Sequence, residues 1–201
     1  MRRLSRLLFR LAGWRTEGNV PPDPRYVLIA APHTSNWDAV VMLLAARIFG
    51  IELKWFIKDS WFVFPLGPLM RALGGVPIDR SARHGMVERA IERLAASERL
   101  VLAVPPEGTR KPAPFWKTGF YRIAHGAGVP IVLGYLDYGR KIAGLGPAFT
   151  PTGNLPADFE VFRAFYASIT ARYPKNVGPV AAPPEGGDTT RPAAPRNPSA
   201  V

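Results

Sequence analysis

Apolar and polar residues alternate along the chain in blocks that predict strands and helices in turn. Short, mainly apolar runs predict strands at residues 26–30, 53–57, 76–78, 100–104 and 129–135. Between them, apolar residues recur three or four positions apart and predict helices at about 39–50, 83–96 and 118–127. Strands that alternate with helices predict an α/β fold, a three-layer sandwich with a mostly parallel or mixed central sheet flanked by helices.

The N-terminal residues carry a different pattern. Leu4, Leu7, Leu8 and Leu11 fall on one helical face, and arginines occupy the adjoining positions without any acidic residue. This predicts a basic amphipathic helix within residues 1–17, suited to the interface of an anionic membrane. The alternative is a helix that packs its leucines on the folded domain.

The C-terminal part contains a last helix and a tail. Aromatic residues at helical spacing predict a helix over residues 158–173, and the glycine-rich residues 140–149 predict an extended arm. Residues 174–201 contain seven prolines and almost no large apolar side chain, which predicts a disordered tail. Residues 18–173 are then expected to form one folded domain.

Charge and composition narrow the possible functions. The 201 residues carry a net charge of +11, which favours an anionic partner: nucleic acid, an anionic membrane or a phosphorylated substrate. The absence of cysteine excludes thiol catalysis and cysteine-ligated metal sites. The chain contains no stretch of 18 apolar, uncharged residues, so no transmembrane helix is predicted. The aromatic residues cluster with aliphatic ones rather than among basic ones, so nucleic acid is not an expected partner.

His33 and Asp38 are the candidate catalytic pair. Residues 31–38, with the sequence APHTSNWD, lie between a predicted strand and a predicted helix, where α/β proteins place their chemistry. If the segment turns once, the carboxylate reaches one imidazole nitrogen, fixes its tautomer and leaves the other nitrogen free to accept a proton. The alternative is a loop histidine followed by a helix N-cap. The three scattered histidines give no credible metal-ligand set.

Cations also follow predicted strands. Lys58 and Arg80 end two such segments, and Gly74 and Gly75 allow a tight turn before the second. A third strand ends in the sequence EGTR at residues 107–110, whose Arg110 offers a bidentate grip on phosphate oxygens. One edge of the sheet is therefore expected to gather a base and three cations. A surface turn is the alternative for each segment.

Together these segments resemble, in order, the motifs of the glycerolipid acyltransferases of the bacterial 1-acylglycerol-3-phosphate acyltransferase type. The matches are the His-x4-Asp loop, the glycine-rich turn before Arg80, the EGTR loop and an apolar Val-Pro-Ile at residues 129–131. The resemblance covers about residues 25–150. It implies two groups of site residues. Those expected to hold the substrate phosphate are Lys58, Arg80, Glu107, Gly108, Thr109 and Arg110, and those expected to form the acyl pocket are Trp61, Phe62, Val129, Pro130 and Ile131.

The resemblance implies direct acyl transfer without a metal or a resident cofactor. An acyl-CoA or an acyl-carrier protein would donate the acyl group, and a lysophospholipid would accept it. The expected acceptor is 1-acylglycerol-3-phosphate, converted to phosphatidic acid in phospholipid biosynthesis. The enzyme would then be a peripheral protein on the cytoplasmic side of the membrane. The alternatives are transfer to another lyso-lipid, such as a lyso-ornithine lipid, and a non-catalytic basic module that binds membranes.

Overall fold

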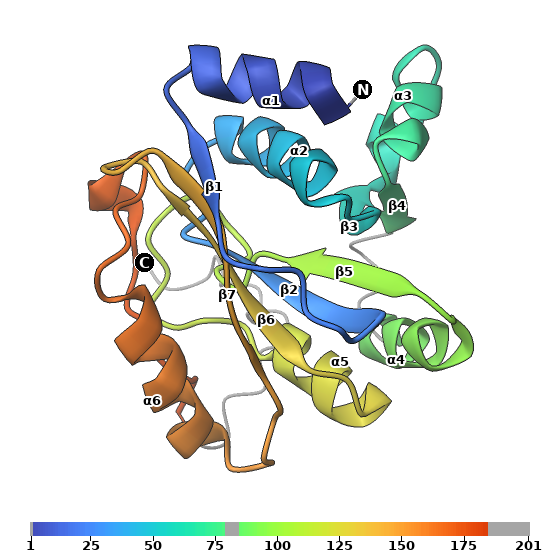
Figure 1. Cartoon of the computed structure of the whole chain (residues 1–201). Coiled ribbons are helices and arrows are strands. Elements are labelled where there is room, and N and C mark those ends of the chain that lie inside the picture. Colours follow the sequence, from blue (N-terminus) through green and yellow to red (C-terminus); the bar gives the residue numbers. More distant parts are fainter. Residues whose placement is uncertain (1, 79–84, 185–201) are drawn as a thin grey trace, which may run out of the picture.

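The computed structural model describes residues 2–78 and 85–184, which form a seven-stranded sheet between two layers of helices (Figure 1). The strands are β1 Arg15–Glu17, β2 Arg25–Ala31, β3 Leu53–Lys58, β4 Gly75–Ile78, β5 Leu100–Val104, β6 Ile131–Asp137 and β7 Ile142–Phe149. The α-helices are α1 Arg2–Leu11, α2 Trp37–Phe49, α3 Leu66–Ala72, α4 Met86–Ala96, α5 Gly119–Ala127 and α6 Leu155–Tyr166, with 3-10 turns η1 Asp59–Trp61 and η2 Pro174–Asn176. The predicted α/β sandwich and N-terminal helix are confirmed.

The sheet is mixed, with strand order β1-β7-β6-β2-β5-β3-β4. All neighbouring strands run parallel except β6 and β7, which form an antiparallel pair. In Figure 1, α1 and α2 lie over one face, and α4, α5 and α6 lie over the other.

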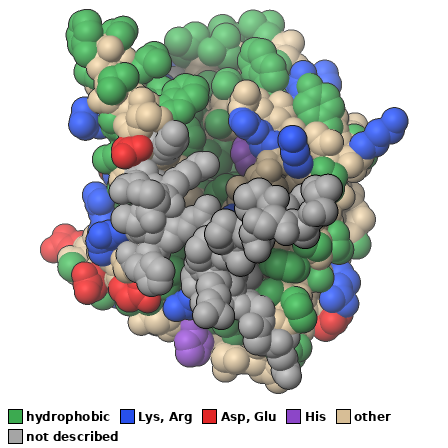
Figure 2. All heavy atoms as spheres, turned by 180° about the vertical axis from the view of Figure 1, so that it is seen from behind, with side chains coloured by type: hydrophobic (Ala, Val, Ile, Leu, Met, Phe, Trp, Pro, Cys, Tyr) green, Lys and Arg blue, Asp and Glu red, His purple; other side chains and the backbone are tan. Residues whose placement is uncertain are grey.

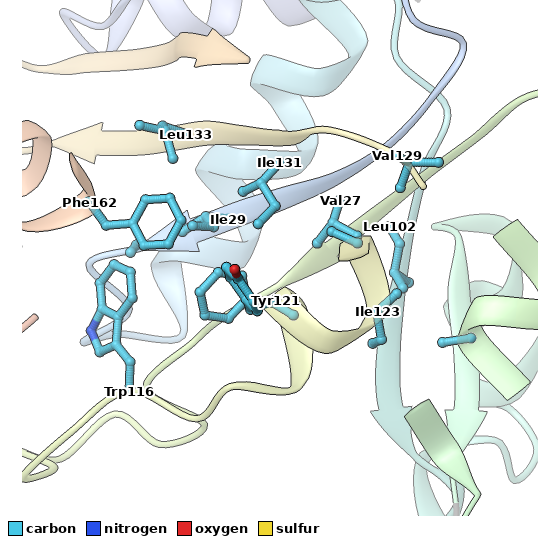
Figure 3. Close-up of a cluster of buried hydrophobic side chains, with 14 of the residues drawn as sticks. Val27, Ile29, Leu102, Trp116, Tyr121, Ile123, Val129, Ile131, Leu133 and Phe162 are labelled. Carbon is cyan, nitrogen blue, oxygen red and sulfur yellow. The ribbon is translucent and has the colours of Figure 1, made fainter. Parts of the chain in front are cut away.

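Both faces of the central strand β2 are buried. Val27 and Ile29 point into the cluster under α5, whereas Tyr26 and Leu28 point towards α2. Figure 3 shows the α5-side cluster, in which strand residues meet aromatic side chains such as Trp116 and Phe162. Burial on both faces explains why the strand sequences are continuous apolar runs.

The topology has a switch point at the carboxyl ends of β2 and β5. The two strands are parallel neighbours. The chain leaves β2 towards α2 on one face, and it leaves β5 towards α5 on the opposite face. The two loops therefore diverge, and such a switch point is where open α/β sheets bind their ligands.

The structure corrects the predictions for the ends of the chain. The N-terminal helix ends at Leu11, and Arg15–Glu17 joins the sheet as β1 beside β7. The last helix ends at Tyr166 rather than at residue 173.

The prediction of a disordered tail is wrong for residues 174–184. The Trp116 N–H donates a hydrogen bond to the Ala181 carbonyl at 2.9 Å, and Val180 and Ala182 pack against the main core. A few small apolar side chains and a backbone partner are enough to order this proline-rich segment. Residues 185–201 lie outside the described part of the chain.

Candidate active site

The loop after β2 brings His33 and Asp38 together. The strand ends at Ala31, and Asp38 lies in the first turn of α2. His33 Nδ1 lies 3.2 Å from Asp38 Oδ2, so the single turn expected from the spacing is present. Among the described residues no group hydrogen-bonds His33 Nε2, and the histidine side chain is 24% exposed. The imidazole is thus held by one nitrogen and accessible through the other.

Asp38 is buried and fully hydrogen-bonded. Its Oδ2 accepts the backbone N–H groups of Thr34 and Ser35, both at 2.8 Å, and its Oδ1 accepts the hydroxyl of Tyr138 at 2.7 Å. Burial raises the pKa of Asp38, but the hydrogen bonds from His33, Tyr138 and the two backbone N–H groups outweigh it, so the pKa lies below the usual value. The carboxylate is therefore an ionised group that orients the imidazole.

The hydrogen bonds of Asp38 exclude the alternative that it is the N-cap of α2. Asn36 occupies the N-cap position of α2 and makes no side-chain capping bond. The N–H groups that Asp38 accepts belong to the preceding loop, not to the second or third residue of the helix. Asp38 thus closes the histidine loop instead of capping the helix.

Glu107 supports the same loop from the end of β5. Its Oε1 accepts the His33 backbone N–H at 3.0 Å, and its Oε2 is buried without a hydrogen-bond partner among the described residues. Burial raises the pKa of Glu107, although hydrogen bonds from the backbone N–H groups of Glu107 and His33 oppose the rise. The sequence grouped Glu107 with phosphate-binding residues, whereas the structure turns its carboxylate inward to position His33.

An apolar cavity opens beside the pair. Its free volume is about 50 Å³, it is partly open to solvent, and its lining includes His33 and Asp38. It runs between the sheet and α2. Its lining also includes Met42, Ala45, Ala46 and Phe49 on α2, and Gly134, Tyr135, Gly144 and Leu145 on β6 and β7. Its mostly apolar lining suits a hydrocarbon group better than a polar one.

Comparisons with known proteins show the family and the fold. A family model described as Acyltransferase matches residues 14–133, which is more than half of the chain. The chain belongs to the acyltransferase family. Among solved structures, the 1-acyl-sn-glycerophosphate (LPA) acyltransferase PlsC from Thermotoga maritima has a similar fold, with a TM-score of 0.55 and 20% identity over 76% of this chain and 68% of that one. A search of curated protein sequences found no significant match.

The cations expected at the site of this acyltransferase are only partly described. Arg110 is exposed in the loop after β5, together with Gly108 and Thr109. Lys58 ends β3 at the same carboxyl edge, but its side chain is not described. Arg80 lies outside the described residues. Thr109 Oγ1 accepts the Lys111 N–H at 3.3 Å, and Gly108 has a φ of +64°, so the loop is a tight turn.

The predicted acyl-pocket residues do not line the cavity. Val129 and Ile131 are buried in the α5-side core, and the Pro130 carbonyl accepts a hydrogen bond from the Val27 backbone N–H. Because β6 begins at Ile131, this motif lies at the amino edge of the sheet, away from His33. The prediction that residues 129–131 shape the pocket is therefore wrong.

The aromatic pair at the end of η1 also lies elsewhere. Trp61 is 53% exposed, and Phe62 is half-buried with the Arg71 guanidinium 5.3 Å from its ring. Neither is among the described residues that line the cavity.

Among the residues that the structure describes, no cluster of three or more potential metal-ligating side chains occurs.

Tyr138 is a site residue that sequence reasoning missed. It lies in the turn between β6 and β7, 100 positions from the carboxylate it contacts. Its ring also meets the Trp14 ring edge-on at 4.9 Å. No local motif marks it, because its position follows from the pairing of β6 with β2 and β7.

Proposed function

We propose that this acyltransferase transfers a fatty acyl group from acyl-CoA or acyl-carrier protein to the hydroxyl of a lysophospholipid. The proposed acceptor is 1-acylglycerol-3-phosphate, and the product is phosphatidic acid. The observation that carries the proposal is the Asp38-held imidazole of His33 at the mouth of an apolar cavity. The family membership and the likeness to the PlsC fold support the same reaction class.

The chemistry follows from the free nitrogen of His33. Nε2 removes the proton of the acceptor hydroxyl, and the oxygen forms a bond to the thioester carbonyl carbon. Asp38 stabilises the imidazolium that results. The tetrahedral intermediate then collapses, the carbon–sulfur bond breaks, and the thiolate leaves and takes up the proton. The substrate supplies its own nucleophile, so the chain needs no serine or cysteine for this step.

The cavity is the proposed site of the acyl chain. Met42, Ala45, Ala46 and Phe49 follow Asp38 along one face of α2, one turn after another. Asp38 and Phe49 are eleven residues apart, or about 16 Å along the helix axis. A chain whose carbonyl lies at His33 can extend along this face away from the catalytic pair.

Arg110, Lys58 and Arg80 are proposed to attract and hold anionic substrate groups. Lys58 ends β3, Arg110 lies in the loop after β5, and Arg80 follows β4 in the sequence; these strands end at the edge of the sheet where His33 lies. Their positive charge favours both an acceptor phosphate and the phosphates of acyl-CoA. Holding the phosphate would orient the neighbouring hydroxyl towards His33.

We also propose that the protein docks on the cytoplasmic side of an anionic membrane through α1. The helix packs Phe9 against Ala45 and Ile48 of α2, which leaves its leucine stripe outside. Leu4, Leu7, Leu8 and Leu11 are all exposed, Leu11 by 76%. Exposed arginines flank them at positions 3, 6 and 10. The leucines do not pack on the domain, as the alternative required, and this favours an interfacial role.

A second apolar element lies near α1. Between η1 and the end of α3, exposed side chains include Val63, Leu66, Leu69 and Phe64, the last exposed by 89%. In Figure 2 hydrophobic side chains gather at the top of the molecule, where Figure 1 places α1 and α3. Among the described residues no helix is long and apolar enough to span a bilayer. Two exposed apolar elements with neighbouring arginines suit surface attachment.

An acceptor panel tests the proposed reaction. The purified protein is incubated with palmitoyl-CoA and, in turn, lysophosphatidate, a lyso-ornithine lipid or no acceptor, and the products are identified by mass spectrometry. We expect phosphatidate from lysophosphatidate. Preferential acylation of the ornithine lipid would replace the proposed acceptor but keep the reaction. Lipid binding without acylation of any acceptor, from either donor type, would favour the non-catalytic module.

A further inference from the structure

The segment after α6 returns to the catalytic loop, beyond the residues matched by the family model. The Tyr173 N–H donates to Thr34 Oγ1 at 3.2 Å, and Thr34 immediately follows His33. This bond fixes the segment against the loop whose backbone also holds Asp38. The side chain of Arg172 is thereby placed at the same edge of the sheet as the catalytic pair.

The Arg172 guanidinium lies among three aromatic rings. Its Cζ is 6.0 Å from the ring centre of Trp37 and 5.6 Å from those of Tyr138 and Tyr173. Trp37 directly precedes Asp38, and the Tyr138 hydroxyl is bonded to the Asp38 carboxylate. The three rings therefore hold a cation beside the residues that flank the catalytic carboxylate.

This cation has no acidic partner among the described residues. Arg140, Arg163 and Arg122 each pair with a carboxylate, whereas Arg172 does not. Its polar neighbours among the described residues are the Tyr173 hydroxyl, 3.4 Å from Nε, and the Tyr138 hydroxyl, and neither carries a negative charge at neutral pH. The Asp38 carboxylate is already bonded to His33, Tyr138 and the loop backbone. A guanidinium stacked on rings keeps the N–H donors at its edge available for a phosphate group.

We propose that Arg172, walled by Trp37, Tyr138 and Tyr173, binds the phosphate monoester of the acyl acceptor, which narrows the role of Arg110, Lys58 and Arg80 to the phosphates of acyl-CoA. The inference rests on the proposed function and adds a specificity-determining residue to it. A phosphate held here would place the acceptor next to the His33–Asp38 pair, on the side formed by the start of α2 and the β6–β7 turn. Trp37 is 57% exposed, so this site is open to a ligand from solvent or from a membrane surface.

Steady-state kinetics with short-chain, monomeric lysophosphatidate test the proposal without a membrane. Arg172→Gln should raise the KM for this acceptor about tenfold or more and change kcat much less, because a charge-assisted contact is lost. Arg172→Lys should give a KM between those of wild type and Arg172→Gln, since lysine keeps the charge but lacks the two parallel N–H donors of the guanidinium. Arg99→Gln is the matched control, since Arg99 is an exposed arginine just before β5. It should behave as wild type.

A binding measurement separates this inference from the proposed reaction. Titration with sn-glycerol 3-phosphate should change tryptophan fluorescence in wild type, and Trp37→Phe should remove most of that signal. Arg172→Gln should weaken the binding about tenfold or more. If inorganic phosphate bound with the same affinity as sn-glycerol 3-phosphate, the site would be a general anion site, and the assignment to the acceptor would be overturned.

The outcomes distinguish the possible failures. An unchanged acceptor KM in Arg172→Gln, with transfer intact, would overturn the inference and leave the reaction standing. A lower Tm with unchanged KM and unchanged glycerol phosphate binding would assign Arg172 a structural role only. A defect confined to vesicle binding would place membrane headgroups, not the acceptor, at this site. Failure of wild type to acylate any phosphorylated acceptor would overturn the proposed function instead, and the titration would still decide whether the site binds phosphate.

Discussion

The position of the cavity beside His33 predicts how a larger side chain in its wall should change the preferred acyl-chain length. Ala46 lines it eight residues after Asp38, about 12 Å further along α2. Ala46→Leu adds three carbon atoms to the wall at that depth. A chain that filled the original cavity must then leave about three methylene groups outside, each worth about 0.8 kcal/mol of burial. The loss of about 2.4 kcal/mol corresponds to roughly a 60-fold lower kcat/KM for the longest chains.

The assay is thiol release from a series of saturated acyl-CoA donors with a fixed acceptor. Chains shorter by three or more carbons should keep their wild-type kcat/KM, so the preferred length should move downward. The control is Ala96→Leu, the same change at an exposed position of α4. A chain-length profile identical to wild type, in an Ala46→Leu protein with unchanged Tm, would refute the placement of the acyl chain. A uniform loss at every chain length would also count against it.

Further predictions concern the residues that hold the site and the membrane. Asp38→Asn should lower kcat by about two to four orders of magnitude. The pKa of Asp38 is lower in the folded protein, so its ionised carboxylate stabilises the fold at neutral pH. This contribution is lost as pH falls through the folded pKa. The difference in stability between wild type and Asp38→Asn should therefore shrink in acid. Glu107→Gln should retain activity within about threefold, because the amide oxygen can still accept the His33 backbone N–H. Glu107→Ala leaves that donor unpaired and should lower the free energy of unfolding by about 1–3 kcal/mol. Equal losses in both variants would show that the charge of Glu107 matters instead. Phe64→Asp should reduce sedimentation with phosphatidylglycerol vesicles and leave turnover of a monomeric acceptor unchanged, and Val161→Asp on α6 serves as the exposed control.

The parts of the site that are local in sequence were predictable. His33 and Asp38 share one loop, so five positions and a strand end were enough to place the carboxylate near the imidazole. The buried strands were recognisable for a similar reason, because continuous apolar runs mark strands covered on both faces. The helix α3 was not predicted; its seven residues include Gly67 and Pro68, both poor helix formers.

The contacts that depend on tertiary structure were not predictable. Tyr138 reaches the Asp38 carboxylate from the turn after β6, and Arg172 reaches the catalytic loop from beyond α6. No spacing rule joins residues 100 or more positions apart. The cavity is equally hidden, because small residues such as Ala45, Ala46 and Gly134 leave space that a pattern of apolar positions cannot distinguish from filled core. Residues 129–131 show the converse error, since an apolar motif was assigned to a pocket without knowing at which end of its strand it lies.

One measurement tests the central claim most directly. Thiol release from palmitoyl-CoA is followed with and without lysophosphatidate, for wild type and for His33→Ala of equal Tm. General-base catalysis by His33 predicts release that requires the acceptor in wild type and falls by about two to four orders of magnitude in the variant. Equal, acceptor-dependent release in His33→Ala would contradict the assignment of His33 as the base.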